Sequence, residues 1–166
     1  MQQAYIALGS NLQQPRRQVE QALDELAQLP QTRLLQQSSL YRTAPLDHNN
    51  HRSEQPEFIN AVAQVETELT PLTLLRALLA IEDRHGRERP YRNAPRVLDM
   101  DLLLYDEVIM NTAELTLPHP RMFERGFVLL PLAEIAPGLT ITGHGKIEAL
   151  AQACPDQDVM RIVEQQ

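Results

Sequence analysis

The stretch PRVLDMDLLLYD, residues 95–106, decides the fold, because it is the most strand-like segment of the chain and yet contains two carboxylates. Side chains on a strand point alternately to its two faces. Asp99 and Asp101 therefore share one face with Leu103 and Tyr105, and the other face is apolar and must lie on the core. Two strand rises separate the Cα atoms of the aspartates by about 6.6 Å, so we expect their carboxylates to lie side by side.

The segments before this strand predict an α+β domain. Strands are expected at 3–8, 32–43 and 57–69, and helices from Pro15 to about Leu29 and from Pro71 to Gly86. The resulting order, β-α-β-β-α-β, is the ferredoxin-like arrangement, an antiparallel sheet with helices on one face. We expect the aspartates on the other face, left open, together with Phe58 and Asn60 of the third strand.

C-terminal additions are expected after this core. They are a short hairpin near YDEVIM (105–110), a helix around FVLLPLAEIA (127–136), a helix near 145–153 and a last strand at DVMRIV (158–163). No linker or repeat divides the chain, so residues 1–166 are predicted to form a single domain.

Composition excludes several classes of protein. The 166 residues are 43% hydrophobic and 22% charged, as is ordinary for a globular protein. The net charge of −7 and the pI of about 5.2 argue against a general nucleic-acid binder. Cys154 is the single cysteine, so no disulfide forms within the chain. No signal peptide or membrane-spanning stretch is visible, and we expect a cytoplasmic protein.

Two adjacent carboxylates have two interpretations. They are either the solvated face of an ordinary alternating strand, or a cation site, since like charges repel unless something neutralises them. Mg²⁺ suits such a pair, because it binds a few carboxylates and shares the rest of its shell with water and phosphate. A carboxylate pair can hold two such ions about 4 Å apart in phosphoryl transfer.

An arginine-rich loop precedes the strand. The segment EDRHGRERPYRNAPR, residues 82–96, has Arg87, Arg89, Arg92 and Arg96 within ten residues. Such a run can be a solvated loop with internal salt bridges, but guanidinium groups also match the geometry of a polyphosphate. No G-x-x-x-x-G-K-[ST] motif is present, which excludes a P-loop kinase. The pattern indicates an enzyme for a small anion with Mg²⁺.

The chain resembles the 6-hydroxymethyl-7,8-dihydropterin pyrophosphokinases of folate biosynthesis. The resemblance runs from about residue 4 to 137 and is carried, in this order, by AYIALGSNL, SSLYRTAPL, EFINAV, GRERPYRNAPRVLDMDLLLYD and LPHPRMFERGFVLLPLAEIAP. It implies a ferredoxin-like fold and transfer of the diphosphate of ATP to the hydroxymethyl group of the pterin, with release of AMP. The chain departs from the family pattern in three places: it has no tryptophan and reads YRNAPR in the arginine loop, it has Glu114 where some members have an arginine, and its loop 44–57 is longer.

The resemblance also implies roles for individual residues. Asp99 and Asp101 match the carboxylates that hold two Mg²⁺ ions, and Arg87 and Arg96 match catalytic arginines that contact the triphosphate. Further residues on the ATP side are Glu82, Arg89, Thr116, His119 and Arg125. Those on the pterin side are Thr43, Pro45, Leu46, Phe58, Asn60 and Phe127, with the two phenylalanines sandwiching the ring and Asn60 bonding its amide edge.

Other interpretations of these residues stay open at this level. A phenylalanine is more often a core residue, and His119 between two prolines is typical of a turn. A non-catalytic ferredoxin-like module that senses a metabolite is the rival from another class, but it would not need both the aspartates and the arginine loop. A Mg²⁺-dependent nuclease is disfavoured by the acidic charge. We expect a monomer that binds ATP and the pterin, and neither nucleic acid nor a membrane.

Overall fold

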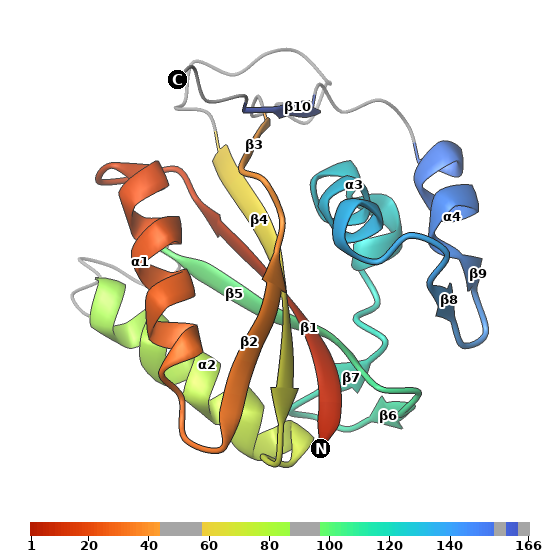
Figure 1. The fold of residues 1–166 in the computed structure, drawn as a ribbon, viewed down its shortest axis with the longest axis horizontal. Helices are drawn as coiled ribbons and strands as arrows, with labels where there is room; N and C mark the ends of the chain where they lie inside the picture. The colour runs from red at the N-terminus through yellow and green to blue at the C-terminus, as the bar shows by residue number, and fades with distance from the viewer. Residues whose placement is uncertain (44–57, 87–96, 155–158, 163–166) are drawn as a thin grey trace.

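The computed structural model describes residues 1–43, 58–86, 97–154 and 159–162, and shows a mixed α/β fold with an antiparallel sheet and, within these ranges, four α-helices (Figure 1). The strands are β1 (Gln2–Ser10), β2 (Thr32–Gln37), β3 (Tyr41–Thr43), β4 (Phe58–Thr67), β5 (Asp99–Tyr105), β6 (Met110–Asn111), β7 (Thr116–Leu117), β8 (Thr140–Ile141), β9 (Gly145–Lys146) and β10 (Val159–Arg161). The helices are α1 (Pro15–Ala27), α2 (Pro71–Gly86), α3 (Gly126–Ile135) and α4 (Ile147–Ala153), with a 3-10 turn, η1, at Met122–Glu124.

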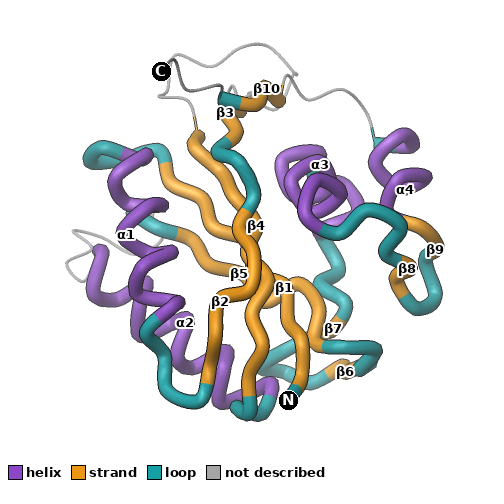
Figure 2. The backbone as a smooth tube through the Cα atoms, viewed as in Figure 1, coloured by secondary structure: helices purple, strands orange, loops and turns teal. Residues whose placement is uncertain are grey.

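The main sheet has the order β10-β3-β4-β1-β5, and β2 pairs with β4 as well. The single strand expected at 32–43 is therefore wrong, because the chain forms two strands there that both pair with β4 (Figure 2). The break falls at Ser38, whose N–H donates to the carbonyl of Val62 at 2.8 Å. The N–H of Val62 donates in turn to the Ser38 hydroxyl at 2.9 Å, so a side chain replaces one bond of the backbone ladder.

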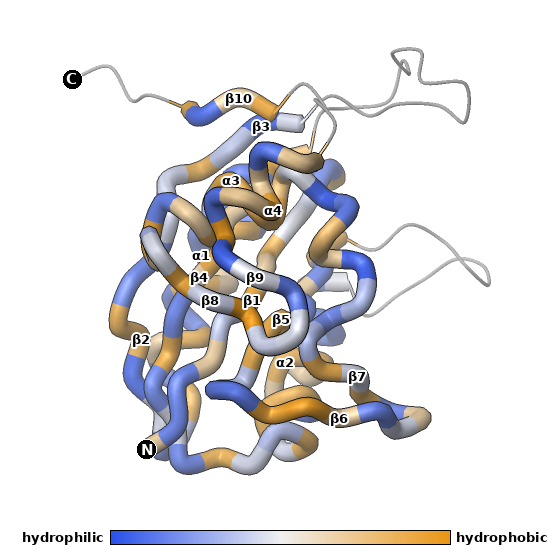
Figure 3. Tube along the Cα trace, turned by 90° about the vertical axis from the view of Figure 1, so that its right-hand side faces the viewer, coloured by the Kyte–Doolittle hydropathy of each residue, from blue (hydrophilic) through white to orange (hydrophobic). Residues whose placement is uncertain are grey.

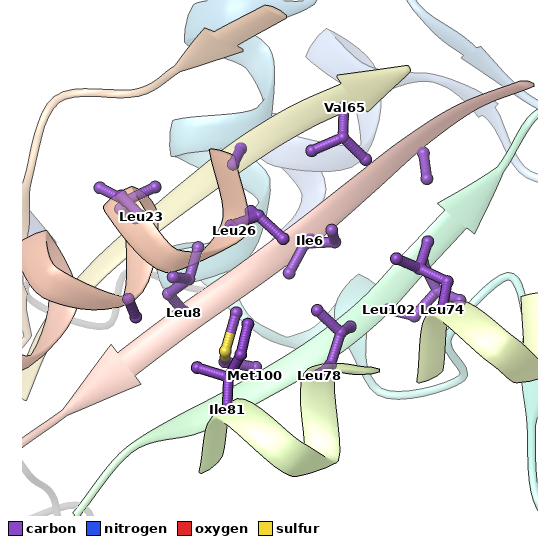
Figure 4. Close-up of a cluster of buried hydrophobic side chains, with 14 of the residues drawn as sticks. Ile6, Leu8, Leu23, Leu26, Val65, Leu74, Leu78, Ile81, Met100 and Leu102 are labelled. Atoms are coloured by element: carbon purple, nitrogen blue, oxygen red, sulfur yellow. The ribbon is translucent and has the colours of Figure 1, made fainter. Parts of the chain in front are cut away.

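The main core lies between the sheet and the helices α1 and α2 (Figure 4). Ile6 and Leu8 of β1 point into it, as their alternation predicts, and Leu23 and Leu26 of α1 meet them. From α2 and β5 come Leu74, Leu78, Ile81, Met100 and Leu102. Leu98, Met100 and Leu102 face this core as expected, whereas Leu104, expected on the same face, does not.

The other face of the sheet is only partly open, which corrects the expectation of a free face. Helix α3 packs on it, with α4 and the β8–β9 hairpin outside α3 (Figures 1 and 3). A second core forms there, in which Val62 and Leu103 of the sheet meet Val128 and Leu132 of α3. The sequence of α3, GFVLLPLAEI, is apolar around most of its circumference, and such a helix needs cover on more than one side.

A β-bulge changes the alternation at the end of β5. Tyr5 of β1 pairs with Leu104 and Ile6 pairs with Leu102, so Leu103 has no paired residue on β1. The extra residue shifts every side chain that follows to the opposite face. Leu104 therefore joins the α3 core, and Tyr105 packs in the α1–α2 core, where its hydroxyl donates to the carbonyl of Leu69. The prediction that Tyr105 shares a face with the aspartates is wrong for this reason.

The C-terminal additions follow the expected order with one change. The hairpin expected at 105–110 lies further on, where Met110 and Asn111 of β6 pair with Leu117 and Thr116 of β7. The helices expected near 127–136 and 145–153 are α3 and α4. The last strand, β10, pairs antiparallel with β3. Within the described ranges, the helices are all too short or too polar to cross a membrane.

Candidate active site

A cavity of about 240 Å³ lies on the second face of the sheet, beside the start of α3. Strands β1, β3, β4 and β5 supply its floor and walls, and the first turn of α3 closes one side. Its lining residues are Ala7, Leu8, Gly9, Thr43, Phe58, Asn60, Asp99, Asp101, Arg125, Phe127 and Val128. The expectation that Phe58 and Asn60 share a face with the two aspartates is confirmed by this lining.

Strand register brings these residues together from distant parts of the sequence. Gly9 of β1 pairs with Asn60 on one side and with Asp99 on the other. Two residues earlier, Ala7 pairs with Asp101. A Cβ atom on Gly9 would come within 2.8 Å of the Asn60 Oδ1 atom, which is closer than real Cβ contacts. Glycine at this position therefore leaves the space that the Asn60 side chain occupies.

The Asn60 amide is held in place by Thr43. Its Nδ2 atom donates to the Thr43 hydroxyl at 2.9 Å, and both side chains belong to residues that are largely buried, with exposed fractions of 5% and 7%. This bond orients the amide, so that Oδ1 is its acceptor end, on the side of Gly9. The cavity thus has a fixed polar wall made of a carboxamide and a hydroxyl.

Two aromatic side chains line the same cavity. Phe58 is the first residue of β4, Phe127 lies in the first turn of α3, and both are half-buried. The guanidinium carbon of Arg125 lies 5.7 Å from the centroid of the Phe127 ring, within the range of a cation–π contact. Apolar rings beside a polar wall suit a flat heterocycle that carries hydrogen-bonding groups on its edge.

The carboxylates lie at the β5 side of the cavity. Asp99 is exposed and Asp101 is half-buried, so neither is withdrawn from solvent. The Arg125 Nη1 atom lies 3.5 Å from Asp101 Oδ2, and the His119 Nε2 atom lies 3.9 Å from Asp101 Oδ1. Arg125 therefore partly neutralises Asp101 in the arrangement that the structure shows.

His119 lies next to Asp101, in surroundings that favour the neutral imidazole. Its N–H donates to the carbonyl of Leu103 at 2.9 Å, which places it beside β5. Burial lowers the pKa of the imidazole below its usual value, the guanidinium groups of Arg125 and Arg121 lower it further, and Asp101 opposes them. The N–H of Arg121 donates to His119 Nδ1 at 3.2 Å, so the ring proton lies on Nε2, toward Asp101.

Glu82 supports the aspartate-bearing strand from the opposite side of the sheet. It lies on α2 with an exposed fraction of 6%, and its Oε2 atom accepts the N–H of Met100 at 2.7 Å. Met100 stands between the two aspartates, so this bond fixes the backbone that carries them. Sequence reasoning gave Glu82 a place near ATP but missed this bond, because nothing in the sequence pairs a helical glutamate with one particular backbone N–H.

The structure brings most of the predicted site residues to one place. Seven of them line the cavity: Thr43, Phe58, Asn60, Asp99, Asp101, Arg125 and Phe127. His119 contacts Asp101, while Glu82 and Thr116 do not line the cavity. Pro45, Leu46, Arg87, Arg89 and Arg96 lie outside the described residues. Gly9 was missed as a site residue, although a glycine directly after the predicted strand 3–8, in the sequence GSN, was a usable signal.

A larger cavity of about 620 Å³ lies elsewhere, between α1, the β2–β3 connection and β10. Its polar groups bond largely among themselves or with the body of the protein. Arg16 pairs with Glu20 at 2.8 Å, and the Ser39 hydroxyl donates to Glu134 at 2.8 Å. None of the described residues that line it is aromatic. We therefore assign the site to the smaller cavity, where aromatic rings, an amide and a carboxylate pair converge.

Comparisons with known proteins identify the family of the chain. Residues 5–137 match the family model of 7,8-dihydro-6-hydroxymethylpterin-pyrophosphokinase (HPPK). The chain is similar to the 2-amino-4-hydroxy-6-hydroxymethyldihydropteridine pyrophosphokinase of Pseudomonas aeruginosa, with 44% identity over 162 residues that cover 98% of each chain. The enzyme of that name from Haemophilus influenzae is 43% identical over 159 residues, covering 96% of this chain and 97% of its own.

Solved structures show the same fold. A crystal structure of Plasmodium falciparum HPPK-DHPS matches 92% of this chain with a TM-score of 0.68 at 14% identity. The chain spans 43% of the length of that longer protein, so the likeness concerns only part of it. The family match and the near full-length relatives decide the classification: the chain belongs to the 7,8-dihydro-6-hydroxymethylpterin-pyrophosphokinase family.

Proposed function

We propose that this chain, an ATP-dependent pyrophosphokinase of folate biosynthesis by its family, performs diphosphate transfer in the cavity beside α3. The hydroxymethyl oxygen of the pterin attacks the β-phosphorus of ATP in line. A bond forms between them, the bond from the β-phosphorus to the α,β-bridging oxygen breaks, and AMP leaves. The observation that carries the proposal is the convergence of Phe58, Phe127, Asn60 and the two aspartates on one cavity.

The pterin is proposed to bind between the two aromatic side chains. Phe58 and Phe127 cover the two faces of the ring, and the polar wall of Asn60 and Thr43 meets its amide edge. Since the Asn60 amide is already oriented by Thr43, little side-chain freedom is lost when the ring binds. Pro45 and Leu46, which lie outside the described residues, are proposed to complete this side through their backbone.

The aspartate pair is proposed to hold two Mg²⁺ ions. Among the described residues no cluster of three or more His, Cys, Asp or Glu side chains forms a closed metal site. An accessible pair of carboxylates nonetheless fits Mg²⁺, which keeps water and phosphate oxygens in much of its shell. When bound, Mg²⁺ supplies positive charge to the phosphate oxygens.

Side chains of the protein place the triphosphate and accept the proton. We propose that Arg125 turns from Asp101 toward a phosphate oxygen when ATP binds, since its contact at 3.5 Å is a weak one. His119 lies beside Asp101 and is proposed to contact ATP there. Thr116 and Glu82, which do not line the cavity, and Arg87, Arg89 and Arg96, from the part of the chain not described, are also proposed to act on ATP. The hydroxyl proton passes to Asp99 or to solvent.

Four further predictions complete the proposal. The strand order β5-β1-β4, continued by β2 and β3, supports the ferredoxin-like class for the core. We propose that residues 1–166 form one domain, and that it acts as a monomer. The cytoplasmic location stays a prediction from the sequence.

Substitution of the aspartates tests the metal proposal. In Asp99→Asn and Asp101→Asn we expect turnover at saturating Mg²⁺ to fall about 100-fold or more, because each amide removes a charge that holds the cation. The dissociation constant of the pterin, measured without nucleotide, should change little. The matched control is Asp24→Asn, which removes an exposed carboxylate on α1. Near-normal turnover of Asp99→Asn would show that the pair does not hold metal.

A further inference from the structure

His85 joins the two helices on the side of the sheet opposite the cavity. It lies in the last turn of α2, and its side chain is buried, with an exposed fraction of 3%. Both ring nitrogens meet side chains of α1. The Nδ1 atom lies 2.6 Å from Gln18 Oε1, and the Nε2 atom lies 2.8 Å from Glu25 Oε1.

Both partners can only accept a hydrogen bond. The Gln18 amide is oriented by its Nε2 atom, which donates to the carbonyl of Gln13 at 2.9 Å, so Oε1 is the atom that faces the ring. The second carboxylate oxygen of Glu25 lies 3.3 Å from the Arg84 guanidinium, which favours the ionised carboxylate. Each ring nitrogen of His85 must therefore carry a proton, because a bare nitrogen would face an oxygen lone pair in a buried place.

The same end of α2 is tied to the strand that bears the aspartates. One turn before His85, Glu82 accepts the N–H of Met100 at 2.7 Å. One residue after it, a Cβ atom on Gly86 would lie 3.2 Å from the Val97 side chain, so the helix end packs directly on Val97. The Ser10 hydroxyl in turn donates to the carbonyl of Val97. A shift of this helix end would therefore move the backbone on which the aspartates stand.

We propose that His85, held as an imidazolium between Gln18 and Glu25, is a positioning residue for the aspartate pair. It fixes the last turn of α2 against α1, and Glu82 transmits that position to Met100. This role rests on the proposed function of Asp99 and Asp101. Because the pterin cavity lies on the other face of the sheet, His85 acts on the use of Mg²⁺ and ATP rather than on pterin binding.

The protonation state is tested by ¹⁵N NMR of histidine-labelled protein at neutral pH, without substrates. The His85 signal is assigned by its loss in His85→Gln. We expect both ring nitrogens of the wild-type His85 to carry a proton. In Glu25→Gln the new amide can donate to Nε2, so the ring should become neutral there. A wild-type ring with one unprotonated nitrogen would overturn the proposal, whatever the activity of the enzyme.

The positioning role is tested by kinetics of His85→Leu, with folding checked by its thermal transition. We expect turnover to fall about tenfold and half-saturation to need more Mg²⁺, with the pterin dissociation constant within about twofold of the wild type. His85→Gln keeps one donor for Glu25, so its turnover and its Mg²⁺ requirement should lie between those of the wild type and His85→Leu. It serves as the readout if His85→Leu does not fold. The control Arg76→Ala removes an exposed group of the same helix that pairs with Glu114 and should behave like the wild type.

The outcomes separate this proposal from the proposed function. Unchanged turnover and Mg²⁺ dependence in folded His85→Leu would overturn the positioning role, as would an equal loss of pterin affinity, which would indicate general loosening. If Asp99→Asn kept its turnover, the metal assignment would fail instead, and the His85 variants would then have no aspartate pair to act on. The NMR measurement tests the protonation of His85 independently of both sets of kinetic results.

Discussion

The side chain of Asn60 lies over Gly9, its partner on the neighbouring strand: a Cβ atom added to Gly9 would sit 2.8 Å from Asn60 Oδ1. Asn60 cannot easily turn away, because its Nδ2 atom is bonded to the Thr43 hydroxyl in a buried position. The polar wall of the cavity thus depends on the absence of a side chain at residue 9.

Gly9→Ala should therefore weaken pterin binding. The methyl group must displace the Asn60 amide, and overpacking of this kind costs about 1–3 kcal/mol. If that cost falls on the bound state, the pterin dissociation constant rises about tenfold. Calorimetric titration of the folded variant with the pterin measures it directly.

A double-mutant cycle shows whether Asn60 is the group displaced. In an Asn60→Ala background the clash is gone, so adding Gly9→Ala should change the pterin dissociation constant by less than about twofold. If the two substitutions were additive, the contact between Gly9 and Asn60 would not be the cause of the lost affinity.

Arg125→Gln should have opposite effects on Mg²⁺ and on ATP. The guanidinium lies 3.5 Å from Asp101, so its removal takes a competing cation from the carboxylate. The guanidinium also repels a Mg²⁺ ion on Asp101, and near the protein surface this repulsion is worth about 1 kcal/mol. Without it, Mg²⁺ alone should bind about fivefold more tightly. The Michaelis constant for ATP should nevertheless rise and turnover should fall. Weaker binding of Mg²⁺ in the absence of nucleotide would contradict the assignment of Asp101, and the exposed neighbour Arg121 offers a matched control, Arg121→Gln.

Glu134 fixes α3 over the sheet. Its carboxylate accepts the hydroxyls of Tyr41 and Ser39, each at 2.8 Å, and lies 3.7 Å from the Arg161 guanidinium. Phe127 is in the first turn of the same helix, so the bonds that hold Glu134 also hold one wall of the cavity.

Glu134→Gln should lower both stability and pterin affinity. Hydrogen bonds to a charged group contribute about 1.5–3 kcal/mol each, and the amide keeps some of them, so we expect a loss of about 1–2 kcal/mol in the free energy of unfolding. Denaturant titration measures the stability, and pterin titration should show weaker binding. The control is Glu114→Gln, which removes the same charge from an exposed pair with Arg76 and should change neither quantity.

The pH dependence of stability offers a separate test of Glu134. Burial alone would raise the pKa of its carboxyl, but hydrogen bonds from Tyr41 and Ser39 and the nearby Arg161 hold that pKa below its usual value. A lowered pKa in the folded state stabilises the fold above the unfolded value, about 4.3 for a glutamate, and this contribution disappears as the pH falls through the folded value. The stability difference between wild type and Glu134→Gln should be constant from neutral pH down to about 5 and shrink below about 4. A difference that did not shrink in acid would mean that the carboxylate charge contributes nothing there.

Residue alternation was enough to predict that Phe58 and Asn60 share a face with the two aspartates, whereas the other predicted residues of the cavity were expected only from the family resemblance. Phe58 and Asn60 lie on one face of β4 and Ile59 on the other, as the pattern EFINAV indicates. This worked because the register of a sheet with a buried face is fixed by its apolar residues. The succession of elements implied that β1 lies between β4 and β5, but the register that pairs Gly9 with both Asn60 and Asp99 comes from the structure.

Other features have no signal in the sequence. The bulge at Leu103, which moves Tyr105 to the opposite face, lies within a run of apolar residues whose composition does not mark its position. The break at Ser38 depends on a hydroxyl that replaces a backbone bond with Val62. The hydrogen bonds from Glu134 to Tyr41 and from His85 to Gln18 join residues that are 93 and 67 positions apart in the sequence, respectively. Long-range polar contacts of this kind are specified by the tertiary fold rather than by local sequence pattern.

The most direct test of the account is to mix the protein with ATP, Mg²⁺ and 6-hydroxymethyl-7,8-dihydropterin and to resolve the nucleotide products by chromatography. The account predicts that AMP forms in step with a diphosphorylated pterin. Formation of ADP would mean that the enzyme transfers a single phosphoryl group, and the assignment of the reaction would be wrong. If no nucleotide were consumed while the pterin still bound, the cavity would belong to a sensor rather than to an enzyme.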